Sequence, residues 1–306
     1  MNNGAKSRNF LEVTDLTAAE LVHVLDLSER EISSLGVPLA GKGVALIFEK
    51  PSNRTRHSIE MAVVQLGGHP VYTRGEEVGL EVRETVEDVT QVMSGYHALL
   101  AARVFSHSTV QRMAAVSTVP VVNMLSDFAH PLQGLADVLT MRQQIGGLAA
   151  KTVTYIGDYN NVARSFAQAS AMLGMHVRLG CPEGYDASID DLEQIGELGA
   201  ASVEQYRDID VAAKGAHAVH TDVWTSMGQE SESQKREIAF AGYQITPSVM
   251  ANAESGAIFM HCLPAHRGHE VAAEVIDSAA SRVFAQAHNR MHSARGLLAF
   301  LMEEQQ

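Results

Sequence analysis

The chain of 306 residues has only two cysteines, Cys181 and Cys262. Two thiols are too few for a disulfide framework, which excludes the small disulfide-stabilised secreted domains and favours a reducing compartment. No stretch approaches the roughly 18 consecutive apolar residues of a membrane span, and the first 30 residues lack the apolar segment of a secretion signal. We therefore expect a cytoplasmic protein with no membrane partner.

Positive charge is also scarce, because 23 lysines and arginines face 36 aspartates and glutamates, for a net charge of −13. Such a surface disfavours nucleic acid and anionic membranes as partners. The hydrophobic fraction of 46% and charged fraction of 19% are those of a globular protein, and the length allows two ordinary domains. An anionic ligand of this chain must be held by local cationic groups, so any arginine cluster is informative.

Short apolar runs alternate with amphipathic segments along the whole chain. We predict strands at 44–48, 69–73, 99–105, 119–124, 152–156, 177–180, 218–221, 257–260 and 283–285. We predict helices after Thr17, from Ser52 or Asn53 to Gly67, and at 84–95, 130–145, 162–173 and 289–302, with a mobile loop at 74–83. This rhythm indicates an α/β fold built from parallel βαβ units. Because a second series of strands starts at Lys151, we place a domain boundary after residue 147.

The segment Ser52-Asn53-Arg54-Thr55-Arg56 lies between the first predicted strand and the helix that follows it. A helix N-terminus presents backbone N–H groups and the positive end of the helix dipole, which together favour an anion. Arginine suits phosphate because its planar group donates two parallel hydrogen bonds. The alternative is a capped surface helix with solvated arginines.

Further polar clusters follow other predicted strands or open helices. They are Arg103, His130 to Gln133, Asp222 to Gly228, and His261 to Pro264. Ligands of open α/β sheets bind beyond the carboxyl ends of the strands, where these clusters fall. Asp222 is either a solvated turn residue or a carboxylate for a substrate ammonium, and Cys262 is either a nucleophile or a pocket-lining group.

Two cofactor hypotheses find little support in the sequence. His261, Cys262, His266 and His269 match no standard zinc spacing, and Pro264 interrupts them, so we predict no metal site. The turn at 157–161 resembles the start of a nucleotide-binding unit but lacks the full glycine fingerprint.

Taken together, these motifs resemble those of the aspartate/ornithine carbamoyltransferase family, and they occur in the family's order along essentially the whole chain. The matching segments are Ser52 to Arg56, Leu66 to His69, Arg103, His130 to Gln133, Asn160 to Ala163, Asp222 to Gly228, His261 to Pro264, and Asn289 to His292. The block from Asp222 to Gly228 resembles the ornithine-using members rather than the aspartate-using ones.

The resemblance implies two three-layer α/β domains with parallel sheets, joined by interdomain helices, with the active site in the cleft between them. Residues 1–147 would bind carbamoyl phosphate, with the terminal helix 289–306 packed back on them, and residues 148–288 would bind ornithine. The implied assembly is a homotrimer.

The resemblance also implies a site, carried over residue by residue. Carbamoyl phosphate would be bound by Ser52, Asn53, Arg54, Thr55, Arg103, His130, Gln133, Cys262, Leu263 and Arg290. Ornithine would be bound by Asn161, Asp222, Ser226 and Met227. Arg103, His130 and Cys262 would be catalytic. The implied reaction transfers the carbamoyl group to the δ-amine of L-ornithine, giving L-citrulline and phosphate for arginine biosynthesis, and it requires neither a metal nor an organic cofactor.

Three positions depart from the family pattern: Asn53, Leu132 and Tyr159. Tyr159 stands where glycine is frequent and adjoins the implied ornithine pocket, so a different amine, such as putrescine or an acylated ornithine, is the alternative substrate. A non-catalytic binding paralogue is disfavoured by the presence of Arg54, His130 and Cys262. A nucleotide-dependent oxidoreductase is disfavoured by the missing fingerprint.

Overall fold

The computed structural model of the protein describes residues 8–226 and 228–303, whose contacts divide into two units. Unit 1 is assigned up to Leu135 and from Arg290 onward, and unit 2 is Ala136–Asn289. Both divisions fall inside helices, in α6 (Pro131–Ile145) and α13 (Val283–Glu303). The split predicted from the sequence lies just after the first of these helices.

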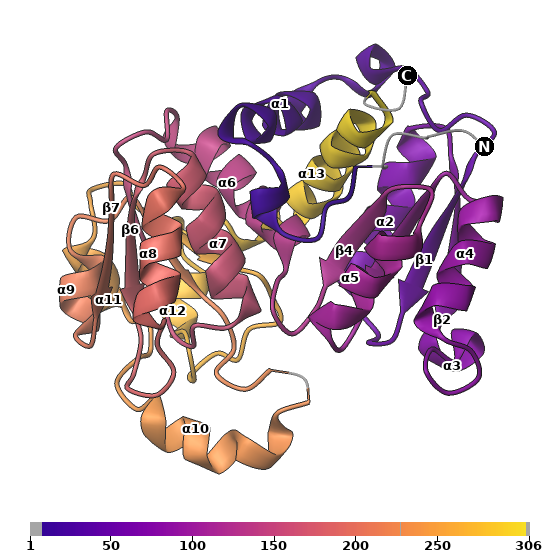
Figure 1. Cartoon of the computed structure of the whole chain (residues 1–306). Coiled ribbons are helices and arrows are strands. Elements are labelled where there is room, and N and C mark those ends of the chain that lie inside the picture. Colours follow the sequence, from indigo (N-terminus) through magenta and orange to yellow (C-terminus); the bar gives the residue numbers. More distant parts are fainter. Residues whose placement is uncertain (1–7, 227, 304–306) are drawn as a thin grey trace. The chain divides into compact units, whose positions relative to one another are not determined.

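Unit 1 is built on a four-stranded parallel sheet (Figure 1). Its strands are β1 (Gly43–Phe48), β2 (His69–Arg74), β3 (Leu99–Arg103) and β4 (Val121–Leu125). Its helices are η1 (Val13–Asp15), α1 (Ala18–Glu29), η2 (Ile32–Leu35), α2 (Asn53–Gln65), α3 (Gly75–Val78), α4 (Val86–Tyr96) and α5 (His107–Val116), with the ends of α6 and α13.

The strand order of unit 1 is β2-β1-β3-β4, so the chain moves outward from β1 to β2 and then returns past β1 to β3. Right-handed crossovers in opposite directions place their helices on opposite faces of the sheet. Accordingly, α4 and α5 cover the face that carries Ala45 and Ile47. The reversal leaves a topological switch point between β1 and β3, which is where ligands of open α/β sheets bind.

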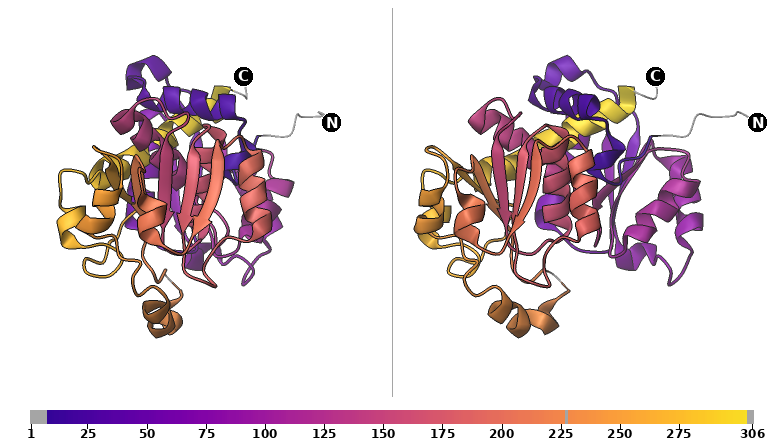
Figure 2. Two further views of the ribbon diagram at one scale, coloured as in Figure 1. Left: turned by 90° about the vertical axis from the view of Figure 1, so that its left-hand side faces the viewer. Right: turned by 60° about the vertical axis from the view of Figure 1, so that its left-hand side comes forward.

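Unit 2 contains a five-stranded parallel sheet whose strands lie side by side in Figure 2. Its strands are β5 (Thr152–Ile156), β6 (His176–Gly180), β7 (Ser202–Tyr206), β8 (Ala218–Thr221) and β9 (Ile258–His261). Its further helices are α7 (Asn161–Met172), α8 (Ile189–Glu197), α9 (Ile209–Ala213), η3 (Glu230–Glu232), α10 (Ser233–Ala239), α11 (Pro247–Asn252) and α12 (Ala273–Ile276).

The strand order β7-β6-β5-β8-β9 puts the switch point of unit 2 between β5 and β8. One face of this sheet packs against α9, α11 and α12 around Ile156, Val219 and Phe259. The other face carries Tyr155 and His220, whose rings contact Phe166 of α7. Helices therefore cover both faces of each sheet, which confirms the predicted α/β class with two parallel sheets.

Two local predictions are wrong. The predicted loop at 74–83 contains the short helix α3. The Glu77 carboxylate caps its first turn by accepting hydrogen bonds from the backbone N–H and the side chain of Arg74. The predicted last strand at 283–285 is the beginning of α13. The strand-like pairing lies just before it, where Ser281 forms a bridge to Phe259, and the chain then turns into a helix uninterrupted by glycine or proline until Gly296.

Among the described residues, no helix combines the length and the apolar character needed to cross a membrane.

Candidate active site

The tip of α2 lies at the switch point of unit 1, directly after β1. Ser52 has an extended backbone and caps the helix, since its Oγ accepts a hydrogen bond from the Thr55 N–H and donates one to Thr55 Oγ1 at 3.0 Å. This capping leaves the first backbone N–H groups of the helix directed at whatever lies beyond its tip. Asn53 is exposed there and Arg54 is half-buried.

Thr55 joins three distant segments of the chain. Its side chain is 1% exposed, and its Oγ1 accepts hydrogen bonds from Arg103 Nη1 at 3.4 Å and from Arg290 Nη2 at 2.5 Å. Arg103 ends β3, where a register shift against β4 marks a bulge, and Arg290 comes from α13. Bulges re-aim side chains at sheet ends. Two guanidiniums thus converge on the helix tip, and both belong to residues that the family resemblance, rather than the Ser52 to Arg56 motif, assigned to this site.

Arg56, in the same motif, faces another way. Its guanidinium lies 3.7 Å from the ring centroid of Tyr72 and donates a hydrogen bond to Glu60 at 2.8 Å. This arginine is exposed and engaged on the outer surface of α2, so only part of the cationic motif contributes to the helix tip.

His130 and Gln133 are buried at the start of α6, where Pro131 is the first helical residue. Burial, together with the positive charges of Arg290 and Arg103, lowers the pKa of His130 well below its usual value. The imidazole is therefore neutral at neutral pH. It can donate or accept a hydrogen bond without adding a third positive charge.

In unit 2, the polar side chains of the predicted site lie at the carboxyl ends of β5, β8 and β9. The Asp222 carboxylate, 6% exposed, accepts hydrogen bonds from Cys262 Sγ at 2.9 Å and from Asn160 Nδ2 at 3.2 Å. Asn160 also caps α7 by accepting from Val162 and Ala163. The structure thus brings Asp222 and Cys262 together and adds Asn160, which belonged to a quoted motif but not to the predicted site.

The remaining predicted residues of unit 2 are less closely linked. Asn161 is half-buried at the first position of α7. Ser226 is half-buried, and its N–H donates to the side chain of Gln229 at 3.2 Å. Met227 lies outside the described residues. Leu263 follows Cys262 directly and has a left-handed backbone, with φ of 59°. Such a conformation is rare for a leucine and fixes the direction of its carbonyl.

A buried pair supports the Cys262 loop from behind. Since His261 Nδ1 accepts the Leu263 N–H at 2.9 Å, the ring proton is on Nε2, which donates to Glu270 at 3.1 Å. The Glu270 carboxylate also accepts the His266 N–H at 2.6 Å. Glu270 was not predicted from the sequence, in which only its four-residue spacing from His266 indicates the contact.

A second buried pair anchors the segment after Asp222. Arg236 of α10 is 5% exposed, and its Nη1 donates to Asp158 at 2.7 Å and to the Trp224 carbonyl at 2.9 Å. Burial nevertheless raises the pKa of Asp158 above its usual value, with Arg236 opposing the shift. Neither residue was predicted, because nothing in the local sequence around Arg236 indicates its partner.

Tyr159, which departs from the family pattern beside the implied ornithine pocket, contacts other side chains of unit 2. Arg164, which pairs with Asp191 at 2.7 Å, lies over the Tyr159 ring. The backbone N–H of Tyr159 donates to the Tyr185 carbonyl. Burial raises the pKa of the Tyr159 hydroxyl.

Asp222, His261 and Cys262 are close enough to share a metal ion, with ligand atoms within 4.8 Å of one another. Each of these groups is already engaged: both ring nitrogens of His261 are hydrogen-bonded, and the thiol donates to Asp222. An ion would have to displace these bonds, so the observed hydrogen bonding fits a positioned thiol better than a metal centre. His266 and His269, considered with them from the sequence, do not belong to this group.

Known proteins share both the sequence and the fold of this chain. Residues 8–143 match the family model described as the carbamoyl-P binding domain of aspartate/ornithine carbamoyltransferase, and residues 149–301 match its Asp/Orn binding domain. The ornithine carbamoyltransferases of Parafrankia sp. (strain EAN1pec) and Acidothermus cellulolyticus are 44% and 45% identical to it, each alignment covering 97% of both chains. The solved structure of ornithine carbamoyltransferase from Pyrococcus furiosus superimposes with a TM-score of 0.91 at 40% identity, covering 97% of each chain. The resemblance seen in the motifs is confirmed, and the chain belongs to the aspartate/ornithine carbamoyltransferase family.

Proposed function

We propose that this chain is an ornithine carbamoyltransferase, which transfers the carbamoyl group of carbamoyl phosphate to the δ-amine of L-ornithine and releases L-citrulline and phosphate for arginine biosynthesis. The observation that carries the proposal is the convergence of Arg103 and Arg290 on buried Thr55 at the tip of α2. A chain of net charge −13 gains a local anion site only by such an arrangement.

Unit 1 supplies the groups for carbamoyl phosphate. The first N–H groups of α2 and the side chains of Ser52, Asn53, Arg54 and Thr55 bind the phosphate, with Arg290 beside them. Arg103 and neutral His130 donate to the carbamoyl oxygen, where negative charge develops in the tetrahedral intermediate. Such a donor contributes about 3–4 kcal/mol to the stabilisation of a transition state. Gln133 orients the carbamoyl NH₂.

Unit 2 supplies the groups for ornithine. Asp222 pairs with the α-ammonium, and Asn161, Ser226 and Met227 hold the rest of the amino acid. Because the Cys262 thiol donates to Asp222, it is fixed in one orientation, and we propose that these two groups together align the δ-amine. The buried His261–Glu270 pair positions this loop through the Leu263 N–H.

The chemistry balances without a further reagent. The lone pair of the neutral δ-amine forms the new C–N bond, the carbonyl oxygen takes up negative charge, and the C–O bond to phosphate then breaks. The departing phosphate can accept the proton that the amine loses. Most of the acceleration therefore comes from holding two substrates in reacting geometry, an effect that can reach roughly 7–11 kcal/mol.

A citrulline assay with carbamoyl phosphate and L-ornithine tests the proposal, with putrescine and N-acetylornithine offered separately as the amine. We expect turnover of L-ornithine only; turnover of another amine alone would refute the substrate assignment. Arg54→Ala should lower kcat/KM by about 10²–10³-fold. Arg56→Ala is the matched control, because Arg56 is engaged with Tyr72 and Glu60, and it should change kcat/KM by no more than about twofold.

We also propose a homotrimer located in the cytoplasm. The family resemblance supports the trimer, and the two cysteines, both buried and neither in a disulfide bond in the described structure, are compatible with a reducing compartment. Light scattering of the purified chain measures the assembly directly, and a monomer or dimer mass would contradict it.

A further inference from the structure

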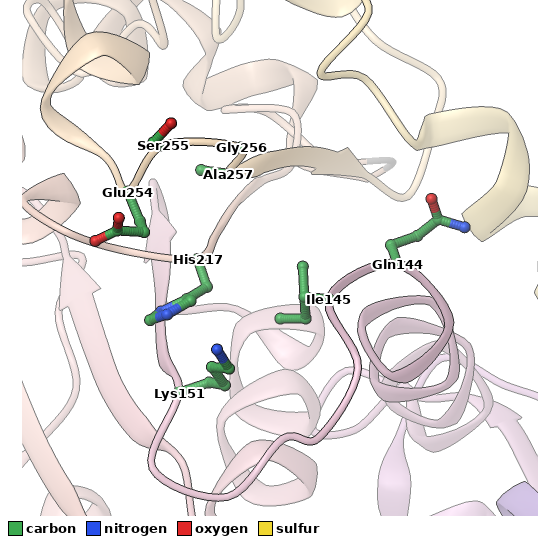
Figure 3. A pocket seen from close by; sticks show the side chains of 8 residues that line it. All are labelled: Gln144, Ile145, Lys151, His217, Glu254, Ser255, Gly256 and Ala257. Carbon is green, nitrogen blue, oxygen red and sulfur yellow. The ribbon is translucent and has the colours of Figure 1, made fainter.

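A cavity opens in unit 2 at the amino ends of β5, β8 and β9 (Figure 3). Its volume is about 360 Å³, within the range of small-molecule sites. Since the strands are parallel, Asp222 and Cys262 lie at the other end of the strands, where β8 and β9 finish. His217 and Asp222 are five residues apart along β8, which corresponds to roughly 16 Å. The cavity is therefore separate from the proposed ornithine site.

The walls of this cavity carry one group of each charge. Lys151 is half-buried, and Glu254 is exposed at the rim. Among the residues that the structure describes, no side-chain hydrogen bond or ion pair is found for either of them. Figure 3 shows the Lys151 ammonium directed toward the space between His217 and Ile145.

The hydrogen-bonding state of His217 is fixed by its neighbour. Its Nδ1 accepts the Thr152 N–H at 3.2 Å, so the neutral ring carries its proton on Nε2 and is a donor. The Gln144 side chain is held by Arg282 at 2.7 Å and points away from the other labelled side chains in Figure 3. Ile145 and Ala257 add apolar wall. The cavity thus offers two donors in its lining, a carboxylate at the rim and an aliphatic surface.

We propose that this cavity binds a free α-amino acid with an uncharged, apolar side chain. The ligand carboxylate pairs with Lys151 and the His217 Nε2–H, its ammonium pairs with Glu254, and its side chain lies on Ile145 and Ala257. A multivalent anion is disfavoured by Glu254 and by the carbonyl end of α6, and a metal cation is disfavoured by Lys151. A zwitterion is complementary to both charges at once.

L-leucine is the probe, measured by calorimetry and by saturation-transfer NMR on the full chain. We expect a Kd on the order of 1 mM. N-acetyl-L-leucine, which lacks the ammonium, and L-leucinamide, which lacks the carboxylate, should bind at least about tenfold more weakly. Equal binding of all three compounds, or no binding of L-leucine at about 10 mM, would overturn the proposal.

Variants assign the binding to this cavity. Lys151→Met and Glu254→Gln keep the size of each side chain and remove its charge, so each should weaken L-leucine binding about tenfold or more while leaving the citrulline assay unchanged. Asp222→Asn should lose turnover and keep L-leucine binding. If instead L-leucine binding is lost only in Asp222→Asn, the probe occupies the ornithine site, and the inference is wrong while the proposed function stands.

Discussion

At the scale of single residues, hydrogen-bond direction decides what each group of the site can do. The Asp222 carboxylate can only accept, so the Cys262 thiol must be the donor in the bond between them. The same reasoning assigns the Nε2 proton of His261 from its acceptance of the Leu263 N–H. These assignments make Cys262 a positioned thiol rather than a free nucleophile.

Removing this donor should weaken catalysis. Cys262→Ala leaves Asp222 with one fewer donor, and we expect kcat/KM for ornithine to fall about 10–100-fold, corresponding to the loss of one hydrogen bond to a charged group. Cys262→Ser keeps a donor and should retain more activity than Cys262→Ala. Cys181→Ala is the control, because it also removes a buried thiol but none of the described site contacts involves it. Wild-type kcat/KM in Cys262→Ala would contradict the assigned role.

Burial of His130 should make stability depend on pH. Its folded-state pKa lies below its unfolded value, so the unfolded chain binds a proton more readily, and stability present above about pH 6.5 is lost as the pH falls toward the folded value. We expect His130 to contribute a loss of about 1.4 kcal/mol between pH 7.5 and 5.5. Denaturant unfolding at both pH values gives, for wild type and for His130→Asn, the change in the free energy of unfolding between pH 7.5 and 5.5. The difference between these two changes measures the contribution of His130. The same change in wild type and in His130→Asn would show that His130 is not the titrating group.

At the scale of elements, α13 contacts each unit through a different set of side chains. In unit 2, Gln286 donates to Asp137 at 2.7 Å, and Asn289 donates to Thr140 at 2.9 Å, both on α6. In unit 1, Arg290 reaches Thr55, and Arg295 donates to the Ser28 carbonyl at the end of α1. The polar contacts of α13 therefore fall within unit 2 up to Asn289 and within unit 1 from Arg290 onward.

The backbone of α13 passes close to α1 at Gly296. A Cβ added there would lie 2.6 Å from the Val24 carbonyl oxygen and would also collide with Ser28 Oγ. We expect Gly296→Ala to destabilise the protein by about 1–3 kcal/mol, because the two helices must separate.

Gly95 in α4 provides the control for this substitution. It is also a helical glycine, but an added Cβ meets nothing within 4 Å. Gly95→Ala should therefore stabilise the protein by about 0.5–1 kcal/mol through helix propensity. Denaturant midpoints of the two variants should move in opposite directions, and a stabilising Gly296→Ala would refute the close helix packing.

At the scale of the whole molecule, the two units share one sheet architecture but carry different polar side chains at the strand ends. Each has a parallel sheet with a switch point, and each places its polar groups at the carboxyl ends of the strands beside that point. Unit 1 gathers arginines there and unit 2 gathers a carboxylate and a thiol, which fits one anionic substrate and one cationic substrate.

This division predicts separate protection by the two substrates. Carbamoyl phosphate alone should slow amide hydrogen exchange in α2 and in the part of α13 after Arg290. At about 100 times its Kd it should raise the local opening free energy by up to about 2.7 kcal/mol. L-ornithine should slow exchange around Asp222 and Cys262. Protection by carbamoyl phosphate confined to unit 2 would contradict the assignment of the phosphate site.

The sequence by itself determined the class of fold and indicated most of the polar residues of the proposed site. Strand and helix periodicity identified the parallel α/β arrangement because buried parallel strands are short continuous apolar runs, such as 44–48 and 152–156. It missed β7 because this edge strand is nowhere fully buried and carries a mixed polar pattern. Motif spacing located Thr55, Asp222 and Cys262 because their roles depend on positions at element ends, which local sequence encodes.

Only the tertiary structure decided which side chains meet. Arg290 is 235 residues from the Thr55 it contacts, and Arg236 is 78 residues from Asp158, and no local pattern records either pairing. Arg54 and Arg56 look equivalent in the sequence, yet the helix turns the latter toward Tyr72 and Glu60. The depressed pKa of His130 likewise arises from burial beside two arginines of remote segments. Long-range contacts and desolvation are properties of packing, so they appear only once the chain has folded.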